Sequence, residues 1–110
     1  MDLYQEIQQK TNELDISVKQ LRTSGTAFAQ AEKEYKIELR QQALKLRAEK
    51  DMPVTLIQQV VFGIPEVAEL RFKRDIAEAI YQANQESINS IKLQLRLLEA
   101  QLNREWSNVK

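Results

Sequence analysis

Both prolines and one of the two glycines of this 110-residue chain lie within a single stretch, residues 51–65. Proline ends a helix that reaches it from the N-terminal side, so the chain has to turn in this stretch. The segments on either side are rich in strong helix formers such as Gln, Leu, Glu, Lys, Arg and Ala. The sequence therefore predicts an all-α fold in one domain, a long helical hairpin with helix one over residues 1–50, a connector with a short helix over residues 51–65, and helix two over residues 66–110.

Helix one carries a heptad pattern typical of coiled coils. Asp2 is a suitable N-cap for it. One seam position is occupied, at seven-residue intervals, by Ile7, Leu14, Leu21, Phe28 and Tyr35. The alternating position is occupied by Tyr4, Thr11, Val18, Gly25, Glu32, Leu39 and Leu46. We expect these two sets of side chains to face helix two.

Gly25 and the polar residues around it leave the continuity of helix one open, because glycine costs about 1 kcal/mol relative to alanine within a helix. A break here would make Ser24 or Thr26 the cap of a new helix. Leu21 and Phe28 remain in phase across the stretch, which favours a continuous helix.

The connector contains the expected short helix. Pro53 suits its first turn and Gly63 its C-terminal cap, and Pro65 opens helix two. We expect the short helix to close the end of the hairpin and to bury four apolar side chains against the long helices: Leu56, Ile57, Val60 and Val61.

Helix two has a regular seam and a wider apolar face than that seam requires. The seam consists of Val67, Leu70, Arg74, Ala77, Tyr81, Asn84, Ile88, Ile91, Leu95, Leu98 and Leu102, and continues to Glu105 and Val109. Outside it lie Ile76, Ile80, Leu93 and Leu97, which one partner helix would leave uncovered. A homodimer that forms a four-helix bundle would cover these side chains, so we expect self-association through them.

Two polar residues fall on the seams, Glu32 in helix one and Asn84 in helix two. A polar residue at such a position fixes the register of neighbouring helices at a cost in stability. We interpret both residues in this way rather than as catalytic or ligand-binding groups.

Three aromatic residues are candidates for contact with a partner protein: Phe62 and Phe72 near the end of the hairpin, and Trp106 near the C-terminus. Tryptophan is frequent in the hot spots of protein interfaces. The alternative for Trp106, which its place beside the seam favours, is that it closes the end of the bundle.

Arg71, Lys73 and Arg74 are candidate nucleic-acid contacts, because residues 46–75 have the outline of a helix-turn-helix unit whose second helix would carry them. Neighbouring residues on a helix cannot all face one way, however. The chain also has sixteen basic and sixteen acidic residues, a net charge of zero. Nucleic acid is therefore a possible partner that the sequence does not favour.

The chain lacks the residues that carry most protein chemistry. It has no cysteine and no histidine, hence no disulfide, no thiolate and none of the commonest general bases or metal ligands. It has no phosphate loop, zinc spacing or nucleophile elbow, and neither a signal peptide nor an apolar run of membrane length. We expect a cytoplasmic protein that is not an enzyme, without cofactor, metal or membrane partner.

Five stretches, spread over nearly the whole chain, carry a resemblance to a known family. The strongest are Met52–Leu56 and Val67–Ala79, and the others are LYQEI near the start, AEKEYK in helix one and LLEAQLNREW near the end. In these stretches the chain resembles small helical proteins of temperate phages and prophages of Gram-positive bacteria, encoded among early genes near recombination and single-strand-binding functions. The resemblance implies an intracellular, phage-derived context and carries no catalytic residue onto this chain.

The leading functional hypothesis is a dimeric helical bundle that binds a phage or host protein, in replication or recombination or as an inhibitor of host defence. The alternatives are a DNA-binding accessory protein that uses the Arg71–Arg74 region and a purely structural scaffold.

Overall fold

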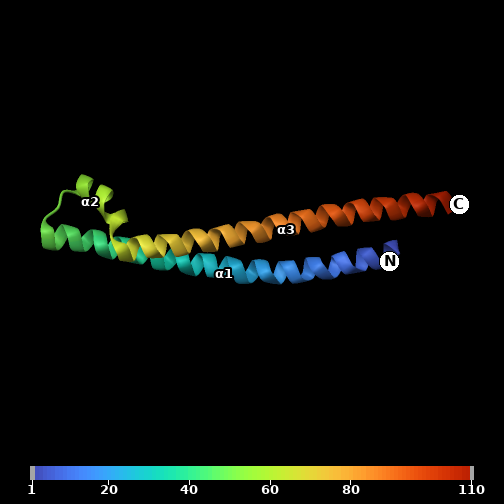
Figure 1. The fold of residues 1–110 in the computed structure, drawn as a ribbon, viewed down its shortest axis with the longest axis horizontal. Coiled ribbons are helices and arrows are strands. Elements are labelled where there is room, and N and C mark those ends of the chain that lie inside the picture. The colour runs from blue at the N-terminus through green and yellow to red at the C-terminus, as the bar shows by residue number, and fades with distance from the viewer. Residues whose placement is uncertain (1, 110) are drawn as a thin grey trace. The chain divides into compact units, whose positions relative to one another are not determined.

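The computed structural model describes the backbone of residues 2–109 and the side chains of residues 2–108. It confirms an all-α helical hairpin, with no strand in the described part of the chain (Figure 1). Its helices are α1 (Leu3–Lys50), α2 (Val54–Val60), the 3-10 helix η1 (Val61–Gly63) and α3 (Pro65–Val109). Within residues 2–109, no helix has an apolar stretch that would span a bilayer.

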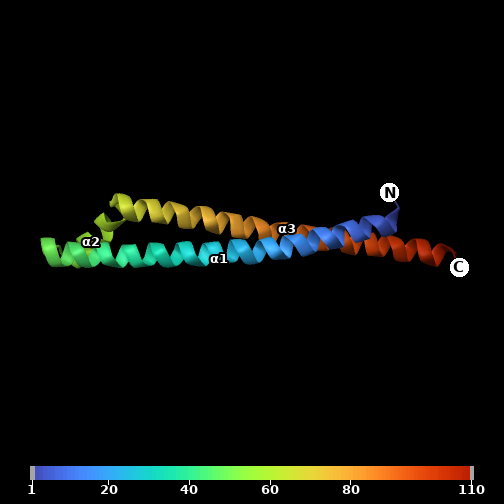
Figure 2. The same cartoon turned by 90° about the horizontal axis from the view of Figure 1, so that it is seen from below.

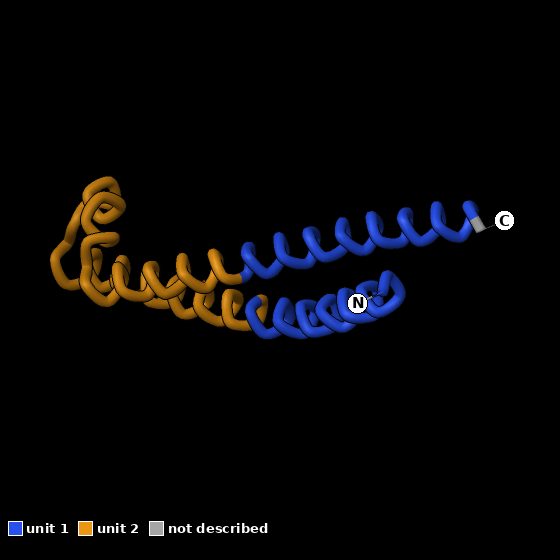
Figure 3. Tube along the Cα trace, turned by 45° about the vertical axis from the view of Figure 1, so that its right-hand side comes forward, with its two compact units in different colours: residues 1–24, 81–110 blue, residues 25–80 orange. Residues whose placement is uncertain are grey.

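The chain divides into two compact units (Figure 3). Unit 1 comprises Met1–Ser24 and Tyr81–Lys110, and unit 2 comprises Gly25–Ile80. In unit 1 the first part of α1 and the last part of α3 lie side by side (Figure 1, Figure 2). In unit 2 the rest of these two helices is joined through α2 and η1.

The start of α1 is fixed by the predicted cap. The backbone N–H of Gln5 donates a hydrogen bond to Oδ1 of Asp2 at 2.8 Å, and the Gln5 side chain accepts one from the Asp2 N–H at 3.4 Å. These reciprocal bonds satisfy N–H groups that have no partner within the helix. The prediction of Asp2 as N-cap is confirmed.

The continuity of α1 through Gly25 is also confirmed. The hydroxyl of Thr23 donates to the carbonyl of Lys19 at 3.3 Å, and that of Ser24 donates to the carbonyl of Leu21 at 3.2 Å. The polar side chains thus bond back to the preceding turn, which lets them stay helical instead of capping a new helix.

The turn after α1 is made by Asp51, whose φ of 49° lies in the left-handed region that Asp tolerates better than most residues. The Met52 N–H donates to the carbonyl of Leu46 at 3.4 Å, and Arg47 Nη1 donates to the carbonyl of Met52 at 3.1 Å. These bonds hold the turn against the last turns of α1.

Two details of the connector differ from the prediction. Pro53 lies in extended backbone just before α2 rather than in its first turn, and its carbonyl accepts bonds from the N–H groups of Leu56 and Ile57, both at 3.0 Å. Gly63 ends η1 without a positive φ, because the chain tightens into a 3-10 turn instead of ending in a left-handed cap. Pro65 begins α3 as predicted.

The core of unit 2 lies where α2 and η1 pack against the long helices. Its buried members are Tyr35, Ile57, Val61 and Val67, and Val67 is fully buried. The connector therefore closes the hairpin as expected, but only in part. Leu56 and Val60 remain exposed, because in a short helix that rests on one face only the residues four apart, Ile57 and Val61, point into the core.

The seam of α1 in unit 1 is shifted from the predicted alternating position. Ser17 and Ser24 are buried, whereas Tyr4 and Thr11 are exposed. The other predicted seam position of helix one, with Ile7, Leu14 and Leu21, is partly buried as expected. Ile88 and Ile91 of α3 are the buried apolar residues among the described side chains of unit 1. Along α3 the predicted seam is confirmed as far as Leu102, beyond which Glu105 is exposed.

Candidate interaction surfaces

The outer residues of α3, which we define as Ile76 and Ile80 in unit 2 and Leu93 and Leu97 in unit 1, are exposed within a single chain. Their exposed fractions are 45%, 52%, 55% and 61%. In each unit the two members are four residues apart, so they lie one helical turn from each other on the same face. Each unit therefore presents a branched apolar patch that the hairpin itself does not cover.

Arg74 is engaged within unit 2. Its guanidinium lies 4.8 Å from the ring centroid of the buried Tyr35, Nη1 is 3.4 Å from Oε1 of Glu32, and Nε donates to Oδ1 of Asp75 at 2.8 Å. Burial opposes its charge, but the hydrogen bond to Asp75 and the attraction of Asp75 and Glu32 prevail and raise the pKa of Arg74 above its ordinary value. Glu32, which lies on the seam, is thus the partner of a cation on the opposite helix.

We expect Arg74→Ala to destabilise the protein by about 1–2 kcal/mol, because it removes the stack on Tyr35 and two charge-assisted contacts. Arg74→Lys should recover less than half of this loss, since an ammonium group cannot stack as a planar guanidinium does. Urea unfolding followed by circular dichroism measures both effects. Lys73→Ala, at the exposed neighbouring position, is the control and should change stability by less than about 0.5 kcal/mol. Equal effects of Arg74→Ala and Lys73→Ala would contradict this role of Arg74.

Asn84 forms a polar layer in unit 1. Its side-chain amide donates to Oγ of Ser24 at 2.7 Å and to the carbonyl of Gln20 at 3.4 Å. Ser24 is 7% exposed, and its hydroxyl donates a hydrogen bond to the carbonyl of Leu21. The layer ties one position of α3 to one turn of α1, which is how a seam asparagine sets register.

The pair Ser24 and Asn84 should show energetic coupling of about 0.5–1.5 kcal/mol in a double-mutant cycle with Ser24→Ala and Asn84→Ala, the net value of a buried hydrogen bond. The control cycle combines Thr23→Ala with Asn84→Ala. Thr23 is an exposed neighbour of Ser24, and its hydroxyl donates to a carbonyl of α1 itself. Thermal unfolding of the variants at one protein concentration gives both coupling energies. Additive effects for Ser24 and Asn84 would show that the bond does not contribute.

The structure does not bring Arg71, Lys73 and Arg74 together. Arg74 turns toward α1, and its side chain is only 19% exposed. Arg71 lies over the ring of Phe62, 5.2 Å from its centroid, and Lys73 is exposed. With Arg74 turned away from solvent, no continuous basic surface for a phosphate backbone forms from these three residues.

The three aromatic candidates are all exposed: Phe62 by 41%, Phe72 by 60% and Trp106 by 67%. A single chain therefore leaves Trp106 uncovered, and its closing of the end of a bundle stays a prediction. Phe62 and Phe72 both belong to unit 2.

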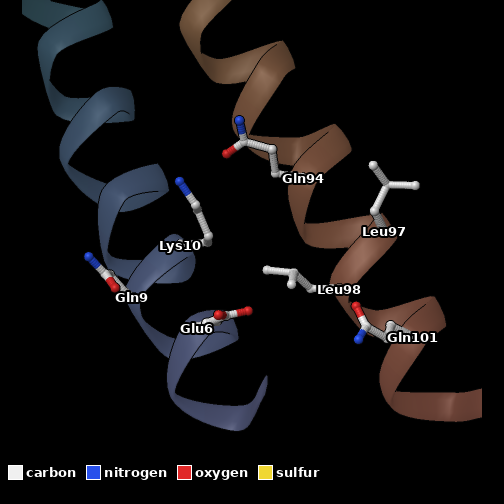
Figure 4. Close-up of a pocket in the computed structure, with 7 residues that line it drawn as sticks. All are labelled: Glu6, Gln9, Lys10, Gln94, Leu97, Leu98 and Gln101. Atoms are coloured by element: carbon white, nitrogen blue, oxygen red, sulfur yellow. The ribbon is translucent and has the colours of Figure 1, made fainter. Parts of the chain in front are cut away.

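Each unit has a groove between helices. The groove of unit 1, of about 500 Å³, has Glu6, Gln9 and Lys10 on α1, opposite Gln94, Leu97, Leu98 and Gln101 on α3. Figure 4 shows Leu98 directed between the two helices and Leu97 directed away. The groove of unit 2, of about 400 Å³, is lined by Lys36, Leu39, Arg40 and Ala43 of α1 and by Ile57, Gln58, Val61 and Phe62 of the connector. Within the described residues, no group of three or more acidic side chains is placed to hold a metal ion.

Sequence reasoning missed the buried serines and the unit 2 groove. A signal for the serines is present, since Leu3, Lys10, Ser17, Ser24 and Ala31 also repeat every seven residues. The groove has no comparable signal, because it forms only where α2 packs beside α1.

Comparison of the chain with protein-family models, with curated protein sequences and with solved structures gives no match.

Proposed function

We propose that this chain is a non-enzymatic protein–protein interaction module that self-associates through the outer residues of α3 and binds a phage or host protein in the bacterial cytoplasm. The observation that carries the proposal is the exposure of Ile76 and Ile80 in one unit and of Leu93 and Leu97 in the other. Exposed branched apolar side chains at one-turn spacing favour a further layer of helices. A second copy of the chain would supply it as a four-helix bundle.

The large solvent-exposed area of the single chain supports a second copy of the chain as the partner that covers the outer residues of α3. The chain exposes 8247 Å², whereas a folded monomeric protein of its mass, 12.8 kDa, exposes about 6300 Å². The surplus of roughly 2000 Å² per chain exceeds the roughly 800 Å² that each partner buries in a standard protein interface. The chain therefore has enough exposed surface to form such an interface with a second copy.

The resemblance of Met52–Leu56 and Val67–Ala79 to phage and prophage proteins supports the cellular context of the proposal. Both stretches belong to unit 2, as do nine of the fourteen large apolar residues that are exposed. We therefore place the contact with a phage or host protein on unit 2.

The experiment that tests the proposal is the introduction of charge into the outer residues of α3. Loss of self-association with full retention of helix content supports it. Unchanged association, or a protein that never associates, overturns it.

A further inference from the structure

The groove of unit 2 has a floor made from the core and a rim that reaches solvent. Ile57 and Val61 of the floor are 7% and 4% exposed, and Leu39 and Ala43 are half-buried. Phe62 stands at the rim. The volume of about 400 Å³ lies within the range of sites that hold ligands, about 300–1,000 Å³.

The spacing of the floor matches a helix. Leu39 and Ala43 are four residues apart on α1, and Ile57 and Val61 are four residues apart on the connector. The groove thus offers two rows of apolar side chains, each with a repeat of one helical turn. An amphipathic helix that lies in a groove uses anchors with the same repeat, at i, i+3 or i+4, and i+7.

The charge on the groove has one sign. Its two charged lining residues, Lys36 and Arg40, are both basic, and Arg71 adds a third cation over the ring of Phe62. Residues 25–80 as a whole carry nine basic and nine acidic side chains, so this concentration is local. It is not the average of the unit.

These cations are available to a partner. Within the described residues no acidic side chain pairs with Arg40. Lys36 lies 3.5 Å from Glu32, but its side chain is 68% exposed, and Glu32 also contacts Arg74. An exposed pair of this kind is weak. Lys36 and Arg40 are again four residues apart, which fits carboxylates one turn apart on an incoming helix.

The groove of unit 1 lacks this selectivity. Its charged lining residues are Glu6 and Lys10, one of each sign, and Lys10 already pairs with Glu13 at 3.1 Å. A groove with opposite charges at its rim does not select a partner by sign.

We propose that the groove of unit 2 binds an acidic amphipathic helix of a partner protein. The apolar side chains of that helix lie on the floor, and its carboxylates face Lys36, Arg40 and Arg71. The proposal rests on the proposed function and deepens it by giving the chemistry of the partner.

The test starts from a random peptide library, so that the charge of the peptides that bind is a result of the experiment. A surface-displayed library of random 16-residue peptides is enriched on the wild-type protein, and the most enriched peptide is synthesised with a fluorescent label. We expect the enriched peptides to be acidic, with apolar residues at helical spacing. Fluorescence anisotropy should then show at least tenfold weaker binding of the labelled peptide to the variant Lys36→Glu/Arg40→Glu.

The matched control is Lys33→Glu/Lys45→Glu, which makes the same change of charge on α1 outside the groove. It should weaken binding less than about threefold, because exposed charges at a distance are screened by salt. Circular dichroism verifies that both variants are folded. Enriched peptides that are neutral or basic, equal weakening by both variants, or the absence of any groove-dependent peptide would overturn the proposal.

Light scattering on the same three proteins separates this proposal from the proposed function. A wild type that binds the acidic peptide but stays monomeric would contradict self-association and leave the groove as inferred. If Lys36→Glu/Arg40→Glu instead abolishes self-association, the occupant of the groove is a second copy of this chain, and the partner helix is excluded.

Discussion

Replacement of both Ile80 and Leu97 by glutamate is expected to convert the self-associated protein into a helical monomer. The two side chains are 52% and 61% exposed in a single chain, so a carboxylate is well tolerated there by the monomer. In an interface the same carboxylates would be buried without a partner, at a cost of several kcal/mol each. We expect at least a hundredfold increase in the dissociation constant, measured by sedimentation equilibrium, with unchanged circular dichroism.

The control for this prediction is Ile16→Glu with Ile37→Glu. These residues lie on α1, one in each unit, and are 56% and 47% exposed. Their replacement introduces the same two negative charges as the test variant. Their replacement should change the dissociation constant less than about threefold if association uses α3. Equal weakening by both pairs would mean that added negative charge, and not the outer residues of α3, governs association.

Val67→Asp is expected to unfold unit 2. Val67 is 0% exposed and packs with Tyr35, Ile57 and Val61 at the start of α3. An unpaired carboxylate in this core costs at least about 3–5 kcal/mol, which is comparable with the whole stability of a small domain. Circular dichroism should show loss of helix, and the aromatic signal of Tyr35 should become that of a solvated tyrosine.

A milder substitution in the same core makes it possible to measure how much Val67 contributes to the free energy of unfolding. Val67→Ala should lower the free energy of unfolding by about 2 kcal/mol, the sum of lost burial and a residual cavity. Val54→Asp and Val54→Ala are the controls, because Val54 lies in α2 of the same unit and is 58% exposed. Both should stay within about 0.5 kcal/mol of the wild type at one protein concentration. Similar losses at residues 54 and 67 would contradict the packing described for α2 and α3.

The ends of the helices could be predicted because each depends on residues close in sequence. Asp2 caps α1 through a bond to Gln5, and Pro65 begins α3 because its ring already has a helical φ. Pro53 marked the end of α1 to within a few residues. The tightening of the chain at Val61–Gly63 could not be predicted, since it follows from the packing of Ile57 and Val61 on the long helices.

The seam of α1 was ambiguous for a definite reason. Leu14 and Leu21 alternate equally well with Val18 and Gly25 or with Ser17 and Ser24, as both choices give steps of three and four. Hydrophobicity favours Val18, but the hydrogen bond from Asn84 stabilises Ser24 in a buried position. The burial of Ser24 thus depends on Asn84, which lies 60 positions away in the sequence. A pattern within helix one alone does not reveal this contact.

The candidate interaction surfaces could also be predicted in part. The outer residues of α3 follow from periodicity alone, because a helix that buries Ile88 and Ile91 has to turn Leu93 and Leu97 away. The fate of Arg74 depends on Glu32 and Tyr35 of the opposite helix. The predicted seam of helix two already separated Arg74 from Arg71 and Lys73, but the seam did not identify the two partners on the opposite helix.

The molar mass of the wild-type chain in solution tests the central claim most directly. Light scattering coupled to size exclusion should give twice the chain mass of 12.8 kDa over a wide range of protein concentration. A mass of one chain at every concentration up to about 100 μM, well above the dissociation constant of an ordinary specific interface, would contradict self-association through α3.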